Sequence, residues 1–169
     1  MRILIFYGRA GAGKSFVGRV CAEEFGFEVY DGDRDLTPEM QRALRQHRTF
    51  SDDMRIEFTA ALSRGIRQWC SESVRKESKV PGIAVCAALF KARDRKKLQL
   101  ELPSARLVWV RASEPLIEVR LQQRTEHLAS SGYAQLVNRG FEPPDPGCDV
   151  LDNDGDRGRI IEQLRAYLS

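Results

Sequence analysis

The eight residues Gly8-Arg9-Ala10-Gly11-Ala12-Gly13-Lys14-Ser15 decide the fold of this chain, and they match the pattern G-x-x-x-x-G-K-[ST]. A continuous apolar run from Ile3 to Tyr7 precedes them and predicts a strand that is buried on both faces. The apolar residues that follow recur at helical spacing and predict a helix over Lys14–Phe25. The eight residues therefore form the turn of a strand–loop–helix unit, which is the context in which this pattern binds phosphate groups. The dinucleotide-binding fingerprint is excluded, because Phe16 stands where that pattern needs a third glycine.

The residue types of this loop suit the terminal phosphates of a nucleoside triphosphate. Glycines adopt backbone conformations that other residues avoid, so successive N–H groups turn toward phosphate oxygens, and the N-terminus of the helix adds further N–H donors. The Lys14 ammonium is expected to neutralise the outer phosphates, and the Ser15 hydroxyl to bind Mg²⁺. The predicted cofactors are ATP and Mg²⁺. The predicted nucleotide-binding residues are Gly8, Ala10, Gly11, Ala12, Gly13, Lys14, Ser15 and, further along the chain, Arg120.

Beyond the loop, short apolar runs alternate with longer helical stretches. This alternation is typical of βαβ units and predicts an α/β fold, with a five-stranded, mainly parallel sheet and helices on both of its faces. The strands are expected at Ile3–Tyr7, Phe27–Tyr30, Ile83–Cys86, Leu107–Val110 and near Asp149–Leu151. No repeat or linker interrupts the pattern, so residues 1–169 are expected to form a single domain. Ligands of such sheets bind beyond the carboxyl ends of the strands, so the loops that follow the strands are the places to look for chemistry.

The composition is that of a globular chain, since 42% of the 169 residues are hydrophobic and 30% are charged. No apolar run approaches the roughly 18 residues of a membrane span. The N-terminal residues lack the features of a cleavable signal, which predicts a cytoplasmic protein. The four cysteines form no CxxC pair and predict neither a metal cage nor a disulfide framework. The net charge of +3 is too small to indicate nucleic-acid binding. The expected partner is therefore a small-molecule acceptor, bound by a monomer or homodimer without nucleic acid or membrane.

Two acids follow the second expected strand. Asp31 and Asp33 are two residues apart, so in an extended segment their side chains point to the same side, toward the phosphate loop. An acid at this place accepts a proton from a substrate hydroxyl or holds the water shell of Mg²⁺. We expect Asp33 to be the base and Asp31 to assist the metal. The alternative is an Asp-Gly turn that only ends the strand.

Basic residues later in the chain are candidates for closing the site. Arg120 and Arg124 are four residues apart on one face of an expected helix that leads into a polar, glycine-bearing loop. This segment, at about 124–140, has the features of a lid whose arginines stabilise charge on a transferred phosphoryl group. The alternative is an exposed face with ordinary surface arginines. Lys91 and Arg93 lie nearest the end of the third strand and are candidates for substrate binding, in a cluster that is otherwise a solvated basic face.

The chain resembles the gluconokinase-like branch of the small P-loop kinases, which are relatives of shikimate kinase. The resemblance covers most of the chain and is carried by residues 8–15, Asp31-Gly32-Asp33, Asp52-Asp53-x-Arg55, Cys86-Ala87-Ala88-Leu89 with Lys91, Arg120-Leu121-x-x-Arg124-x-x-His127 and Glu142-x-Pro144. It implies an ATP-dependent kinase with an acceptor-binding helical segment at about 34–78 and an arginine-bearing lid. It places Asp33 near the substrate hydroxyl. It also implies that Arg55 and His127 contact the substrate and that Arg124 is a catalytic arginine of the lid.

The segment after the Asp-Gly-Asp triplet departs from the gluconokinase pattern. Gluconokinases typically have Leu-His-Pro and then Asn-Ile-x-Lys-Met there, whereas this chain has Asp35-Leu36-Thr37 and Met40-Gln41-Arg42-Ala43-Leu44. The phosphate-handling half of the pattern is intact and the acceptor half is altered. The leading hypothesis is phosphoryl transfer from ATP to a hydroxyl of a small polar metabolite, a sugar acid or polyol. The alternatives are a nucleoside or nucleotide kinase, for which Phe50 and Phe58 are the candidate clamp for the base, and a nucleotide-binding regulatory module without acceptor chemistry.

Overall fold

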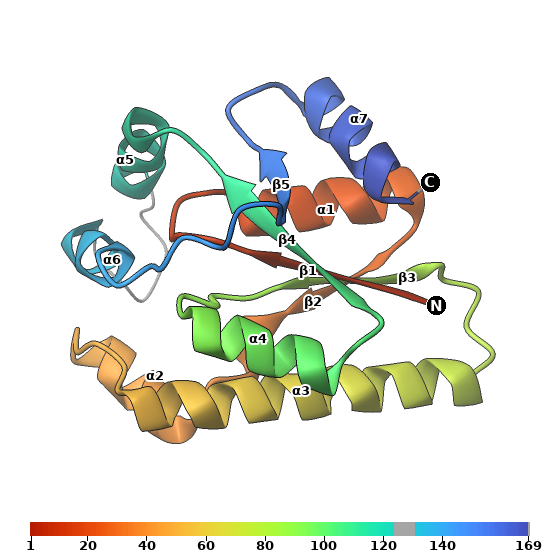
Figure 1. Cartoon of the computed structure of the whole chain (residues 1–169), viewed down its shortest axis with the longest axis horizontal. Coiled ribbons are helices and arrows are strands. Elements are labelled where there is room, and N and C mark those ends of the chain that lie inside the picture. Colours follow the sequence, from red (N-terminus) through yellow and green to blue (C-terminus); the bar gives the residue numbers. More distant parts are fainter. Residues whose placement is uncertain (124–130, 169) are drawn as a thin grey trace.

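All strands of the described residues run parallel in one sheet, in the order β2-β3-β1-β4-β5 (Figure 1). The computed structural model describes residues 1–123 and 131–168. The strands are β1 (Arg2–Tyr7), β2 (Glu28–Asp31), β3 (Gly82–Cys86), β4 (Ala105–Arg111) and β5 (Asp149–Asp152). The helices are α1 (Lys14–Phe25), the short 3₁₀ turn η1 (Gly32–Asp35), α2 (Pro38–Arg45), α3 (Asp52–Arg75), α4 (Ala92–Glu101), α5 (Glu114–Gln122), α6 (Ser131–Asn138) and α7 (Arg157–Leu168).

The central strand β1 is buried on both faces, which explains its uninterrupted apolar sequence. Ile3, Ile5 and Tyr7 belong to the core that the sheet forms with α3 and α4. Leu4 and Phe6 point to the opposite face, into the core with α1 and α7. Figure 1 shows the same two helical layers, one on each side of the sheet. The α/β sheet with helices on both faces, predicted from the alternation of apolar runs and helical stretches, is therefore confirmed.

Two polar side chains start the helices of the segment after β2. The Thr37 hydroxyl accepts a hydrogen bond from the Met40 amide at 3.2 Å, with Pro38 at the first position of α2. The Ser51 hydroxyl accepts one from the Met54 amide at 3.2 Å and begins α3. Such caps satisfy N–H groups that have no partner within the helix, and so they fix where each helix begins.

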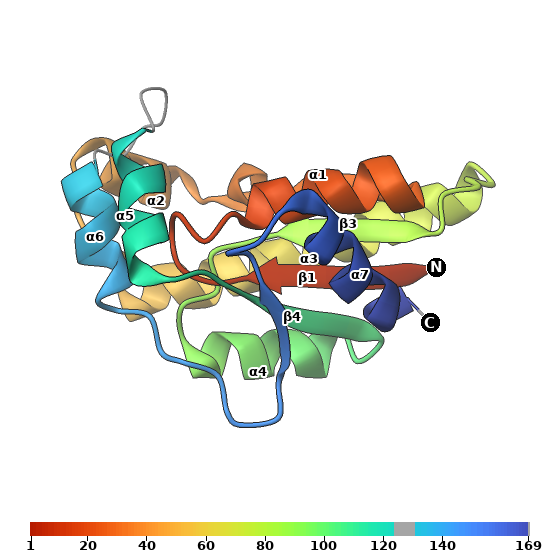
Figure 2. The same ribbon diagram turned by 90° about the horizontal axis from the view of Figure 1, so that it is seen from above.

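The carboxyl ends of the parallel strands meet at one edge of the sheet, and the phosphate loop (residues 8–15) lies at this edge. In Figures 1 and 2, helices α2, α5 and α6 gather around this edge, while both termini lie at the opposite end of the molecule. Within residues 1–123 and 131–168, no helix combines the length and the apolar character that crossing a membrane requires. The fold thus brings the loops after β1, β2 and β3 together at the edge around which α2, α5 and α6 lie.

Candidate active site

The phosphate loop has a backbone that only glycine accommodates at several positions. Gly11 and Gly13 have φ values of 85° and 91°, in the left-handed region that other residues rarely adopt. A Cβ atom at Gly13 would also lie 2.1 Å from the Asn153 amide nitrogen, and one at Gly8 would lie 2.4 Å from the Val110 carbonyl oxygen. Both the conformation and the close packing therefore require these glycines.

The loop is braced from the end of the last strand. The Asn153 side chain donates a hydrogen bond to the Ala12 carbonyl at 2.8 Å, and Arg120 donates to the same oxygen at 3.3 Å and to the Asn153 carbonyl at 2.8 Å. Asn153 is 1% exposed, and burial lowers the pKa of Arg120. Arg120, predicted to bind nucleotide, is thus placed against the main chain of the loop. Sequence reasoning missed Asn153, although an asparagine directly after a strand at this edge was the available signal.

A second brace comes from α6. The Ala10 amide donates to Asn138 Oδ1 at 2.8 Å, and Asn138 Nδ2 donates to the Ala10 carbonyl at 3.0 Å. Ala10, predicted as a nucleotide contact, therefore has both its main-chain N–H and its carbonyl hydrogen-bonded to a side chain 128 positions away. The part of the expected lid that the structure describes is tied directly to the phosphate loop.

Lys14 lies across the loop that precedes it. Its ammonium donates to the carbonyls of Gly8 and Arg9, each at 3.0 Å. It helps to line a cavity of about 150 Å³, here called the loop cavity, whose wall comprises Ala10, Gly11, Gly13, Lys14, Ser15, Asp31, Asp33, Cys86, Ala88 and Phe90. Burial raises the pKa of the Cys86 thiol to about 12, so the group stays protonated and is no nucleophile. The chemical character of this cavity is set by the loop amides, one cation and two carboxylates.

The loop cavity contains oxygen donors that fit Mg²⁺. Ser15 and Asp31 both line it and offer a hydroxyl and a carboxylate. No group of three or more His, Cys, Asp or Glu side chains in the described residues is arranged to hold a metal ion. Magnesium in phosphate-transfer sites is held by one or two protein oxygens together with phosphate oxygens and water, so a sparse donor set of this kind suits it.

The relation between Asp31 and Asp33 differs from the expectation. They do not share an extended segment, because the chain turns into η1 at Gly32, and the Asp31 carboxylate accepts a hydrogen bond from the Asp33 amide at 3.0 Å. The Asp-Gly turn therefore exists, and it carries Asp33 away from the strand. As a result, Asp31 lines only the loop cavity, whereas Asp33 lines both the loop cavity and a second cavity.

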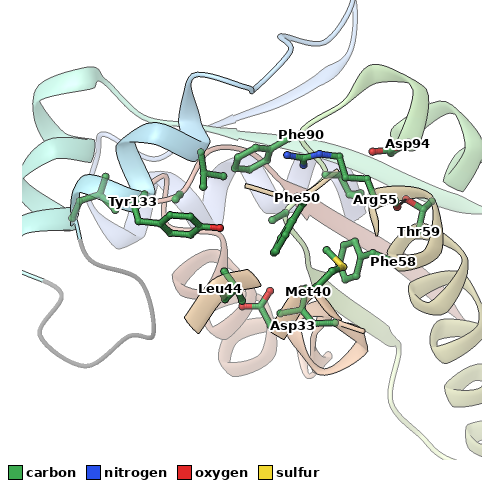
Figure 3. A pocket seen from close by; sticks show the side chains of 17 residues that line it. Asp33, Met40, Leu44, Phe50, Arg55, Phe58, Thr59, Phe90, Asp94 and Tyr133 are labelled. Carbon is green, nitrogen blue, oxygen red and sulfur yellow. Dashed lines mark hydrogen bonds between the residues drawn. The ribbon is translucent and has the colours of Figure 1, made fainter. Parts of the chain in front are cut away.

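The second cavity, here called the apolar cavity, has a volume of about 170 Å³ and lies between α2, α3, α6 and the segment after β3 (Figure 3). Its wall is mostly aliphatic and aromatic. The apolar lining residues are Ala10, Leu36, Met40, Leu44, Phe50, Phe58, Ala88, Leu89, Phe90, Leu121, Ala134 and Val137. The remaining lining residues are Asp33, Arg55, Thr59, Asp94 and Tyr133. Leu36, Met40 and Leu44 lie in the segment that departs from the gluconokinase pattern, so this departure lines a cavity.

Helix α6 closes one side of the apolar cavity. Tyr133 is buried, and its hydroxyl donates to the Arg48 carbonyl in the α2–α3 connection at 2.7 Å. The Tyr133 and His47 rings lie 5.7 Å apart. Together with the pairing of Asn138 with Ala10, these contacts hold α6 against both the segment after β2 and the phosphate loop.

Comparison with known proteins was made at the level of sequence and of structure. No protein-family model and no curated protein sequence matches the chain. A gluconokinase from Sinorhizobium meliloti superposes with a TM-score of 0.76 at 26% sequence identity, covering 99% of this chain and 91% of that one. The chain has the fold of the P-loop kinases.

Further kinases of solved structure share this fold. A sugar kinase from a Janibacter species has a TM-score of 0.78 at 20% identity, covering 99% of this chain and 94% of that one. The APS kinase of Mycobacterium tuberculosis, solved with AMPPNP and APS, has a TM-score of 0.62 at 17% identity, covering 99% and 98%. The predicted resemblance to gluconokinases is therefore confirmed.

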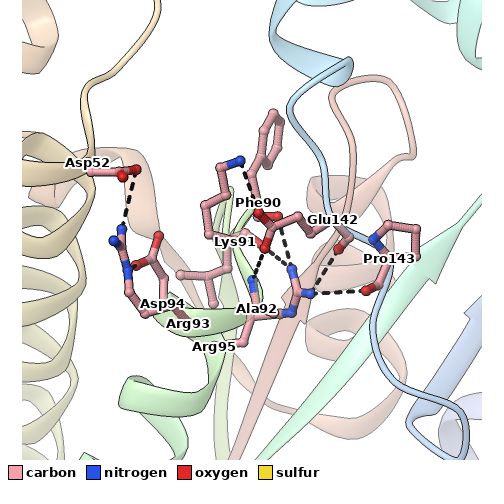
Figure 4. A network of polar contacts seen from close by, with 10 residues as sticks. Asp52, Phe90, Lys91, Ala92, Arg93, Asp94, Arg95, Glu142 and Pro143 are labelled. Carbon is pink, nitrogen blue, oxygen red and sulfur yellow. Dashed lines mark hydrogen bonds and ion pairs between the residues drawn. The ribbon is translucent and has the colours of Figure 1, made fainter.

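In this P-loop kinase fold, Lys91 and Arg93 support the turn after β3 (Figure 4). The Lys91 ammonium lies 3.1 Å from Glu142, whose carboxylate also accepts the Ala92 amide at 2.8 Å. Arg93 pairs with Asp94 at 3.1 Å and with Asp52 at 3.5 Å. Neither Lys91 nor Arg93, two of the predicted substrate-binding residues, lines the loop cavity or the apolar cavity. These ion pairs hold the N-terminal end of α4 against α3, through Asp52, and against the loop that contains Glu142.

Arg95 contradicts the interpretation of the basic cluster as a solvated face. It is 5% exposed and donates to the carbonyls of Leu89 and Phe90 at 3.0 and 3.1 Å, and to that of Glu142 at 2.8 Å (Figure 4). Its guanidinium also lies 5.1 Å from the centre of the Tyr7 ring. The side chain supports the segment that forms one wall of the apolar cavity of the kinase fold, because Leu89 and Phe90 both line it. Arg124 and His127, the predicted lid and substrate residues, lie outside the described residues.

Proposed function

We propose that this chain transfers the terminal phosphoryl group of ATP to a hydroxyl group of a small molecule. The observation that carries the proposal is the position of Asp33, which lines both the loop cavity and the apolar cavity. A kinase needs one site for the triphosphate and one for the acceptor, with a proton acceptor where they meet. The similarity to a gluconokinase and to further kinases of the same fold supports the reaction class.

The phosphate loop would bind the triphosphate of ATP. The main-chain amides around Gly11 and Gly13 and the N-terminus of α1 supply N–H donors for phosphate oxygens, and Lys14 supplies a positive charge. Ser15 and Asp31 are the residues that would hold Mg²⁺, which neutralises charge on the two outer phosphates when bound. Asn153 and Arg120 keep the loop in its shape through the Ala12 carbonyl.

Asp33 would act on the acceptor. Its carboxylate takes the proton of the attacking hydroxyl while the hydroxyl oxygen forms a bond to the terminal phosphorus of ATP. The bond between that phosphorus and the bridging oxygen of the outer two phosphates breaks, and its electron pair leaves with ADP. No covalent enzyme intermediate is needed, so catalysis rests on position and charge. Arginines of the lid, Arg124 among them, would stabilise the negative charge on the transferred phosphoryl group.

Helix α6 would keep water away from the reacting atoms. It bridges the phosphate loop through Asn138 and the α2–α3 connection through Tyr133. Exclusion of water matters for a kinase, because water competes with the acceptor hydroxyl for the phosphoryl group. The predicted lid thus has a physical role in the proposed reaction.

Two classes of acceptor follow from the similarities and the cavity. A sugar acid or polyol is the acceptor that resemblance to gluconokinases favours. A nucleoside acceptor is favoured by the apolar cavity, since Phe50 and Phe58, the candidate clamp for a base, both line it.

Acceptor-dependent release of ADP tests the proposed function. The wild-type chain is incubated with ATP and Mg²⁺, with and without a panel of hydroxyl compounds, and ADP and phosphorylated product are quantified. We expect at least one acceptor to raise ADP release about tenfold or more above the acceptor-free rate, with product formed in equal amount, because the acceptor replaces water as the nucleophile. Nucleotide binding without a phosphorylated product from any acceptor would contradict the proposal and favour a regulatory module.

A further inference from the structure

Asp33 is carried by a very short element, the turn η1, which spans only Gly32–Asp35. The Asp31 carboxylate accepts the Asp33 amide at 3.0 Å, and the Asp33 carbonyl accepts the Leu36 amide at 3.2 Å. Short 3₁₀ turns have few internal hydrogen bonds, and these have poorer geometry than those of an α-helix. Contacts outside the turn must therefore fix where the Asp33 carboxylate lies relative to the phosphate loop.

One such contact comes from Tyr30, the buried residue of β2. Tyr30 is 3% exposed and belongs to the core that the sheet forms with α3. Its hydroxyl donates a hydrogen bond at 2.8 Å to the Asp35 carboxylate, at the end of η1. Burial raises the pKa of Asp35, and the hydrogen bond from Tyr30 opposes this rise because it favours the ionised carboxylate. The bond ties η1 to the core two residues beyond Asp33.

Helix α3 has a glycine where it meets the Tyr30–Asp35 pair. Gly65 stands in the interior of α3, where glycine is less favourable than alanine by about 1 kcal/mol. A Cβ atom at this position would lie 2.0 Å from the Tyr30 hydroxyl oxygen and 3.0 and 3.1 Å from the two carboxylate oxygens of Asp35. The pair and the helix therefore fit together only with glycine here. Proteins break such local preferences mainly at functional sites.

Two arginines flank the Tyr30–Asp35 pair. The Arg34 guanidinium lies 4.7 Å from the centre of the Tyr30 ring. The charges of Arg34 and Arg64 also lower the pKa of Asp35, so they favour its ionised form. Neither Tyr30 nor Asp35 lines the loop cavity or the apolar cavity. The pair therefore acts on the site through η1, which carries Asp33.

We propose that Tyr30, Asp35 and Gly65 are positioning residues for Asp33: their contacts anchor η1 to the middle of α3 and hold the Asp33 carboxylate where the loop cavity meets the apolar cavity. This inference rests on the proposed function, in which Asp33 takes the proton of the acceptor hydroxyl. Displacement of a reacting group by about 1 Å can cost about a hundredfold in rate. A loosened anchor should therefore slow phosphoryl transfer and leave the binding of ATP at the phosphate loop unchanged.

Tyr30→Phe tests the anchor, because it removes the hydroxyl and keeps the buried ring. We expect kcat to fall about ten- to a hundredfold, with the KM for ATP within about a factor of two of wild type. Asp35→Asn keeps an oxygen that accepts the Tyr30 hydroxyl and should stay within about threefold of the wild-type kcat. Tyr167→Phe is the matched control, since the Tyr167 hydroxyl of α7 donates to the Val150 carbonyl, away from both cavities. It should lower the unfolding temperature and keep kcat.

A double-mutant cycle shows whether the anchor acts through Asp33. In Asp33→Asn the proposed base is gone, so adding Tyr30→Phe should change the residual rate by less than about threefold. Gly65→Ala provides a second route to the same displacement, because its Cβ would meet the Tyr30 hydroxyl. We expect it to lower kcat as Tyr30→Phe does, although alanine favours the helix. If Tyr30→Phe does not fold, the same measurements on Gly65→Ala decide.

The outcomes distinguish this inference from the proposed function. A wild-type kcat in Tyr30→Phe and Gly65→Ala, or losses that multiply fully in the double variant, would overturn the inference and leave the kinase activity standing. A loss in Asp35→Asn as large as that in Tyr30→Phe would overturn it too. A wild-type chain that binds AMPPNP and phosphorylates no acceptor would contradict the proposed function, and the positioning role with it.

Discussion

Replacement of Lys14 by alanine is expected to reduce turnover by about a hundred- to a thousand-fold, the range found when one preorganised hydrogen-bond donor is removed from a transition state. The Lys14 ammonium lies across the phosphate loop on the carbonyls of Gly8 and Arg9, within the loop cavity. No other lysine or arginine is among the residues that line that cavity in the described part of the chain. The rate of ADP release at saturating ATP and acceptor measures the effect.

The control for Lys14→Ala is the same change at Lys79, an exposed residue in the connection between α3 and β3. Lys79→Ala should keep wild-type turnover. Thermal unfolding of both variants checks that the fold is retained. A Lys14→Ala variant that turns over within a factor of about three of wild type would remove this residue from charge stabilisation, since the loss would amount to less than one kcal/mol of barrier.

Replacement of Asp33 by asparagine is expected to lower the turnover rate by about a hundred- to ten-thousand-fold while binding of AMPPNP with Mg²⁺ stays unchanged. The substitution keeps the shape of the side chain and removes the carboxylate that would take the hydroxyl proton. Asp33 is exposed and lies outside both hydrophobic cores, so the change should leave the fold intact. The measurements are the turnover rate and the calorimetric Kd of AMPPNP.

Asp53→Asn is the matched control for Asp33→Asn. Asp53 is an exposed aspartate in the first turn of α3 and is absent from the walls of both cavities. It should retain wild-type turnover. An unchanged rate in Asp33→Asn would exclude Asp33 as the base, whereas lost binding of AMPPNP would assign it to the nucleotide instead.

Local patterns predicted the fold well because they act within a few residues. The apolar run of β1, the capping residues Thr37 and Ser51, and the glycines of the loop each act on their own neighbourhood. Parallel strands and short connections then leave few arrangements of the sheet. Strand β2 shows the limit of this reasoning, since Asp31 ends the strand and caps η1, and so Asp33 departs from the extended segment expected for it.

The interior of the site was less predictable, because it depends on residues far apart in the sequence. Asn138 and Asn153 contact the phosphate loop from 128 and 141 positions away. Arg95 stands in a basic run that is typical of an exposed face, yet its guanidinium is buried on main-chain carbonyls. Such contacts exist only once the sheet has formed.

The acceptor segment after the Asp-Gly-Asp triplet was also only partly predictable from the sequence. The sequence revealed that the histidine and lysine of gluconokinases are absent after the Asp-Gly-Asp triplet. It did not reveal that Leu36, Met40 and Leu44 face one cavity with Phe58 of α3 and Val137 of α6. The chemical character of that cavity depends on the packing of α2, α3, α6 and the segment after β3 against one another.

The central claim is that ATP binds with its terminal phosphate between the phosphate loop and Asp33. A crystal structure of the wild-type chain with Mg²⁺ and AMPPNP tests this most directly. We predict that the outer phosphates contact the main-chain amides of Gly11, Gly13 and Lys14, and that the terminal phosphorus faces Asp33 and the apolar cavity. A nucleotide bound elsewhere on the chain, or one whose terminal phosphate points away from Asp33, would contradict the account.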